Sequence, residues 1–87
     1  MKHESHPEIV KRLKRSEGHL RKVIEMLDDG RPCLDIAQQL YAVERAVTAA
    51  KAALIHDHVE HCLADADATP EARDARLAEF RTITRYL

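Results

Sequence analysis

The feature that most constrains this chain is the stretch from Cys33 to Leu63, which contains neither glycine nor proline. A stretch of about 30 residues without a helix breaker can form one helix about 45 Å long. Apolar residues recur along it at helical spacing, namely Leu34, Ala37, Leu40, Tyr41, Val47, Ala50, Leu54 and Val59. We therefore predict a long central helix, along which the rest of the 87-residue chain must be arranged.

A first helix is predicted before the central one. Pro7 suits the first turn of a helix, and the Asp-Gly-Arg-Pro segment of residues 29–32 suits the end of one, with Gly30 just past the last helical residue. Between these points, a stripe of apolar residues at helical spacing comprises Ile9, Leu13, Leu20, Val23, Ile24 and Leu27. We expect residues 1–6, which are polar, to form a flexible tail.

A last helix is predicted after the central one. Thr69 can cap it with its hydroxyl, Pro70 suits its first position and Glu71 is an acid in its first turn. Its apolar face would comprise Leu77, Phe80, Ile83 and Leu87. Together the three segments predict an all-α fold and a single domain covering residues 1–87.

The composition supports this fold and limits the class of protein. The chain has two tyrosines, one phenylalanine, no tryptophan and two glycines, which suits a helical bundle. A chain this short buries a small core, so association with its own copies would stabilise it. Neither a long apolar run nor a signal peptide is visible, so we expect a cytoplasmic protein with no membrane partner. There, cysteines remain thiols unless they serve metal or redox chemistry.

Two cysteines and a histidine in the central helix have the character of a metal site. His58 and Cys62 are four residues apart and therefore share a helix face. Cys33 is 25 residues before His58, about 37 Å along a straight helix, so one chain cannot bring all three to one metal. Two antiparallel copies could place Cys33 of one beside His58 and Cys62 of the other. The alternative is that each cysteine is a small buried hydrophobe.

Further histidines could extend such a site. His61 is a rival ligand beside Cys62, and His3 or His6 of the tail could supply another nitrogen. Thiolates with one imidazole favour Cu(I), whereas an added nitrogen would suit Ni(II), Co(II) or Zn(II). His56 points away from His58 and is the weaker candidate.

A basic segment lies within the first predicted helix of a chain whose net charge is only −1. Between residues 10 and 22, Glu17 is the one acid, and the basic residues are Lys11, Arg12, Lys14, Arg15, Arg21 and Lys22. Such a band, repeated by symmetry in an oligomer, could bind phosphates. A solvated helix face is the simpler reading. No helix-turn-helix or zinc-finger pattern is present.

Three segments resemble the CsoR/RcnR family of helical transcriptional repressors: RLKRSEGHL at 12–20, RPCLDIAQQL at 31–40 and DHVEHCL at 57–63. The resemblance implies antiparallel dimers that form a disc-shaped dimer of dimers. It also implies a metal bound between protomers that lowers affinity for operator DNA. By position, Cys33 with His58 and Cys62 of the partner subunit match the ligand set of the Cu(I) sensors.

The resemblance also implies the DNA contacts. Arg12 and Arg15 match basic first-helix positions implicated in DNA contact, and Arg45 is a basic residue of the central helix near another contact position. With the neighbouring cations, the expected DNA-binding residues are Lys11, Arg12, Lys14, Arg15, Lys22 and Arg45. Two positions depart from the family pattern: His19 replaces a common glutamine, and Glu44-Arg45 stands where many members have Arg-Gly.

Comparison within the family helps to rank the inducers. Nickel and cobalt sensors add an N-terminal histidine, and His3 is two residues from that position. Formaldehyde sensors have proline after the first methionine, where this chain has Lys2. Persulfide sensors keep both cysteines but lack the histidine between them, which His58 supplies here.

We therefore expect a Cu(I)-responsive repressor whose partners are operator DNA and copies of itself, in a homodimer or homotetramer. The alternatives are a Ni(II)/Co(II) sensor with an N-terminal histidine, a thiol or persulfide sensor using Cys33 and Cys62, and a metal-storage protein that binds no DNA. No nucleophile–base arrangement indicates an enzyme or a small-molecule substrate.

Overall fold

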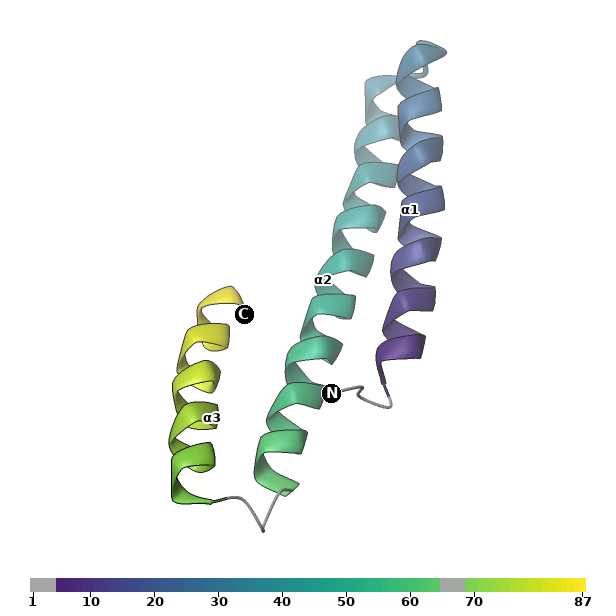
Figure 1. The fold of residues 1–87 in the computed structure, drawn as a ribbon. Coiled ribbons are helices and arrows are strands. Elements are labelled where there is room, and N and C mark those ends of the chain that lie inside the picture. Colours follow the sequence, from purple (N-terminus) through teal and green to yellow (C-terminus); the bar gives the residue numbers. More distant parts are fainter. Residues whose placement is uncertain (1–4, 65–68) are drawn as a thin grey trace. The chain divides into compact units, whose positions relative to one another are not determined.

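The computed structural model describes residues 5–64 and 69–87, with residues 62–64 described by their backbone alone. It contains three α-helices, α1 (His6–Asp28), α2 (Cys33–Ala64) and α3 (Pro70–Ile83), followed by a short 3₁₀ helix, η1 (Thr84–Tyr86) (Figure 1). No strand occurs within these described ranges, which confirms the all-α prediction. Helix α1 begins at His6, inside the segment predicted as a tail, so the prediction is wrong at that residue. Residues 1–4 lie outside the described part.

The turn between α1 and α2 is fixed by backbone hydrogen bonds. Gly30 has φ +66°, the left-handed conformation that suits glycine after a helix end. Its N–H donates to the carbonyl of Leu27 at 3.2 Å, and the Arg31 N–H donates to the carbonyl of Met26 at 3.0 Å. This pair of bonds is the Schellman motif, which satisfies carbonyls at the end of a helix. The predicted role of Gly30 is confirmed.

Helix α3 begins as its sequence predicts. The Ala72 N–H donates to the Thr69 hydroxyl at 3.2 Å, and Pro70 occupies the first helical position. The side-chain cap satisfies one of the amide groups that have no partner within the helix.

The chain divides into two compact units, residues 1–50 and 51–87, and α2 contributes to both. In the first unit, α1 lies along the first part of α2 (Figure 1). The core of this unit comprises Val23 of α1 with Ile36 and Val43 of α2, and Met26 packs against it. In the second unit, Ile55 and Asp57 of α2 are buried. Whether the chain acts as one domain stays a prediction.

Much of the apolar surface of the helices is exposed in the single chain. On α2 the exposed large apolar residues are Leu34, Leu40, Tyr41, Val47 and Leu54, all taken from the pattern that predicted the helix. On α1 they are Val10, Leu13, Leu20, Ile24 and Leu27. Exposed apolar residues that gather into a patch are typical of surfaces that contact another protein, a membrane or a ligand. No helix in the described part of the chain combines the length and apolar character needed to cross a membrane.

Candidate metal centre and nucleic-acid interface

Cys33 is the first residue of α2 and is an exposed, free thiol. The helix begins there because Pro32, which precedes it, provides the carbonyl that accepts the Ile36 N–H at 3.2 Å. The thiol is therefore held at a helix terminus directly after the Schellman turn, where solvent or another protein chain can reach it.

His58 lies in the second unit, and only 17% of its side chain is exposed. Its Nε2 atom is 3.7 Å from the Glu79 Oε1 atom of α3. A carboxylate beside the second ring nitrogen is common for metal-binding histidines, because it fixes the orientation of the ring. The sequence analysis missed Glu79. No sequence signal distinguishes it from the other glutamates of the chain, and its position is known only from the packing of α3.

Cys62 is in the last turn of α2, four residues after His58. Its side chain lies outside the described part of the chain, as does all of His3. The helical backbone places residues 58 and 62 on one face, as predicted.

Two of the predicted ligands, Cys33 and His58, are far apart along one chain. Cys33 and His58 belong to the same helix, in which 25 residues correspond to about 37 Å. Among the described side chains, no three cysteine, histidine, aspartate or glutamate groups come together as a metal site.

The other histidines of α2 have partners within their own helix. The His61 Nδ1 atom is 3.2 Å from the backbone carbonyl of Asp57 and 3.6 Å from its Oδ1 atom. The His56 Nε2 atom is 3.0 Å from the Glu60 Oε1 atom on an exposed face. His6, the first residue of α1, is partly buried.

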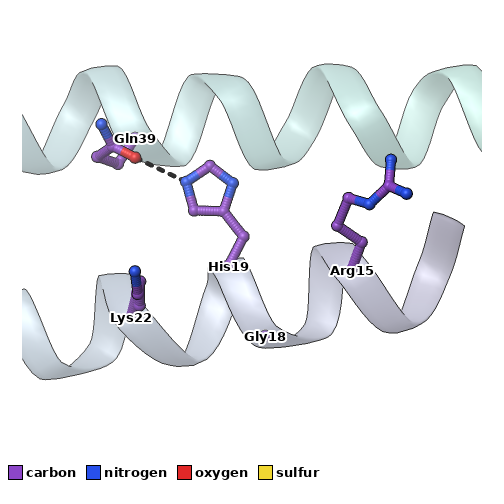
Figure 2. A pocket seen from close by; sticks show the side chains of 5 residues that line it. All are labelled: Arg15, Gly18, His19, Lys22 and Gln39. Carbon is purple, nitrogen blue, oxygen red and sulfur yellow. Dashed lines mark hydrogen bonds between the residues drawn. The ribbon is translucent and has the colours of Figure 1, made fainter.

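The basic residues of α1 are exposed, and two of them line a pocket. Arg15, Gly18, His19 and Lys22 of α1 form its walls with Gln39 of α2, around a volume of about 480 Å³ (Figure 2). The His19 Nε2 atom is 2.6 Å from the Gln39 Oε1 atom. The remaining expected DNA contacts on α1, Lys11, Arg12 and Lys14, are exposed outside this pocket.

Arg45 is exposed on α2, next to Glu44. Its guanidinium carbon is 5.9 Å from the centre of the Tyr41 ring, a cation–π contact that limits the freedom of the side chain. This contact places a positive charge on the first unit that does not come from α1.

A family model described as "Metal-sensitive transcriptional repressor" matches residues 5–85. The chain belongs to this family. The resemblance to the CsoR/RcnR repressors is thereby confirmed, and members of the family regulate transcription rather than catalyse reactions.

Two curated relatives of this repressor family carry copper in their names. The copper-sensing transcriptional repressor CsoR of Bacillus subtilis (strain 168) is 42% identical over 59 residues, which are 68% of this chain and 58% of that protein. The copper-sensing transcriptional repressor RicR of Mycobacterium tuberculosis is 37% identical over 72 residues, which are 80% of this chain and 74% of that protein.

Solved structures of the family share the fold. The nickel-responsive transcriptional regulator InrS has a TM-score of 0.81 and 33% identity, and the match covers 100% of this chain and 98% of that one. A variant of the formaldehyde-responsive regulator FrmR from Salmonella enterica serovar Typhimurium has a TM-score of 0.84 and 30% identity, covering 95% of this chain and 93% of that one. The named inducers of these relatives differ, so family membership alone leaves the inducer of this chain unspecified.

Proposed function

We propose that this metal-sensitive repressor binds operator DNA in its metal-free form and releases it on binding Cu(I). The copper-sensing relatives support the choice of metal. The donor set supports it as well, because two thiolates and one imidazole suit Cu(I) better than a harder ion. Binding to DNA and thiols that stay reduced are consistent with a cytoplasmic protein.

The observation that carries the proposal is the position of Cys33 and His58 toward opposite ends of one helix. We propose that two copies of α2 pair antiparallel, so that Cys33 meets His58 and Cys62 of the partner subunit. The exposed apolar residues of α2 would be covered in this dimer, and those of α1 in a dimer of dimers.

We propose that DNA contacts the exposed cations of the first unit, Lys11, Arg12, Lys14, Arg15, Lys22 and Arg45. Holding Cu(I) would fix the three ligands relative to one another, and the paired helices would then present these cations in an arrangement that no longer fits DNA. By linkage, metal must weaken DNA binding by the same factor as DNA weakens metal binding.

The experiment is an anaerobic Cu(I) titration of the reduced protein, bound to a fluorescent duplex selected from a random pool. We expect DNA release at one Cu(I) per chain. Cys62→Ala and His58→Ala should bind the duplex as the wild type does and respond to Cu(I) poorly or not at all. His56→Ala is the matched control, because His56 is an exposed histidine of the same helix. Release of DNA by Cys62→Ala at the same Cu(I) level would refute the ligand set.

A second candidate inducer is Ni(II) or Co(II), since the InrS match covers the whole chain. His3, His6 or His61 would then provide an additional nitrogen. The same titration with Ni(II) distinguishes the two: release by Ni(II) but not by Cu(I), lost in His6→Ala or a variant without residues 1–5, would favour the nickel sensor.

A further inference from the structure

The pocket between α1 and the first part of α2 gathers three nitrogen-bearing side chains on one side. Arg15, His19 and Lys22 come from successive turns of α1, and Figure 2 shows Arg15 and Lys22 on either side of His19. Gly18 has no side chain, and apart from its two chain neighbours and the nearby backbone of its own helix no atom lies within 4 Å of the place where a Cβ atom would stand. The α1 side of the pocket therefore has free space at Gly18, and the charged groups that line it are cations.

His19 is held in one orientation by Gln39. The 2.6 Å contact joins His19 Nε2 to the amide oxygen of Gln39, which can only accept a hydrogen bond. Nε2 must therefore carry the proton and donate it to Gln39. In the neutral ring, the other nitrogen, Nδ1, then has a lone pair and no proton. Only the imidazolium form can donate from Nδ1 while it keeps the bond to Gln39.

We infer that this pocket receives one phosphate group of the DNA backbone and that His19 binds it as the imidazolium, so that DNA binding takes up a proton. Arg15 and Lys22 attract the phosphate in either state of the ring, since their charges are permanent near neutral pH. The phosphate in turn favours the protonated ring by accepting a hydrogen bond from Nδ1. This inference rests on the proposed DNA binding and adds His19 and Gln39 to its contacts.

The sign of the effect follows from the ring chemistry. The charged groups that line the pocket are Arg15 and Lys22 on α1, and α2 contributes the neutral Gln39. Of the residue types that line the pocket, only histidine ordinarily changes its charge between about pH 5 and 8. A lower pH therefore favours the proposed hydrogen bond from His19 Nδ1 to the phosphate, and the affinity for DNA should rise as the pH falls.

The test compares the metal-free wild type with His19→Gln on a fluorescent duplex of random sequence, because a phosphate contact does not depend on base sequence. Between about pH 8 and pH 6, we expect the wild type to gain about threefold to tenfold more affinity than the variant. At about pH 6, the slope of log affinity against log salt should be smaller by about 1 in the variant. His56→Gln is the matched control and should keep the wild-type pH dependence.

A second variant distinguishes the effect of protonating His19 from a structural effect of replacing it. Gln39→Leu removes the acceptor, so that a neutral His19 can carry its proton on Nδ1 and donate it to the phosphate. This variant should therefore bind DNA with a weaker pH dependence than the wild type. Equal pH dependence in the wild type and His19→Gln would overturn the inference while leaving the proposed function standing. Failure of the wild type to bind any duplex would instead overturn the proposed function. Saturation of His19 by inorganic phosphate, detected from its ring NMR signals, with unchanged DNA binding in His19→Gln, would assign the pocket to a free anion.

Discussion

The side chain of His58 lies beside a residue 21 positions further along the chain, since Glu79 Oε1 is 3.7 Å from its Nε2. Sequence spacing was enough to single out His58 and Cys33, since their types and their distance along one helix limit what they can do. It was not enough to find Glu79, because α3 carries another glutamate, Glu71, and spacing within α3 does not tell which one faces α2. The partner of a proposed metal ligand is set by tertiary packing, which cannot be read from one sequence.

Glu79→Gln tests that partner. The amide keeps the size of the side chain and removes the charge, so we expect the affinity for Cu(I) to fall by about tenfold to a hundredfold. Binding of DNA by the metal-free protein should not change. Competition with a Cu(I) chelator measures the affinity. Glu71→Gln, in the first turn of the same helix, is the control. Equal Cu(I) affinity in Glu79→Gln and the wild type would contradict the role of this carboxylate.

The existence of the three helices could be predicted from the sequence. Two helix ends could be predicted as well, because Gly30 ends α1 and the Thr69 hydroxyl caps the start of α3. Which side of α2 is buried could not be predicted. Ile36, Val43 and Ala50 recur every seven residues and are buried, whereas Leu40, Val47 and Leu54 recur at the same interval and are exposed. Both sets satisfy helical periodicity, so only the packing of α1 decides between them.

The two glycines should respond to alanine in opposite directions. Gly30 has φ +66°, so Gly30→Ala should lower the free energy of unfolding by about 1–2 kcal/mol through backbone strain. Gly18 is inside α1 with open space at its Cβ position, so Gly18→Ala should raise it by up to about 1 kcal/mol. Urea denaturation followed by circular dichroism measures both. A stabilising Gly30→Ala would be incompatible with the Schellman turn described here.

At the scale of the whole molecule, the proposed dimer requires a surface that is complementary to itself. The α2 residues that follow Cys33 at alternating steps of four and three are Ala37, Leu40, Glu44, Val47, Lys51, Leu54 and His58. These positions form one stripe of the helix, and between Cys33 and His58 the stripe is apolar except for one acid and one base in its middle. When Cys33 lies beside His58 and Cys62 of the partner subunit, Glu44 lies beside Lys51 of the partner subunit. A parallel pair would instead bring Glu44 against its own copy.

Exchange of these two charges tests the orientation of the pair. Glu44→Lys and Lys51→Glu should each weaken self-association by about tenfold or more, because like charges would then face each other twice in a symmetric dimer. The double variant, with the charges exchanged, should recover association to within about threefold of the wild type. Sedimentation equilibrium measures all three. Glu60→Lys, which alters the charge on another face of α2, should associate normally, and a double variant no better than the singles would argue against the antiparallel register.

The separation of Cys33 from His58 within α2 would make the response to metal depend on the concentration of the protein itself. In the proposed dimer, a monomer would hold only part of each binding site, so the metal threshold would depend by mass action on how many copies are made. A higher protein concentration would lower the metal concentration needed for a response, up to the point at which every copy is paired. At low protein concentration few copies would be paired. The cell would then lose both the response to the metal and the repression of the controlled gene, since both depend on the dimer.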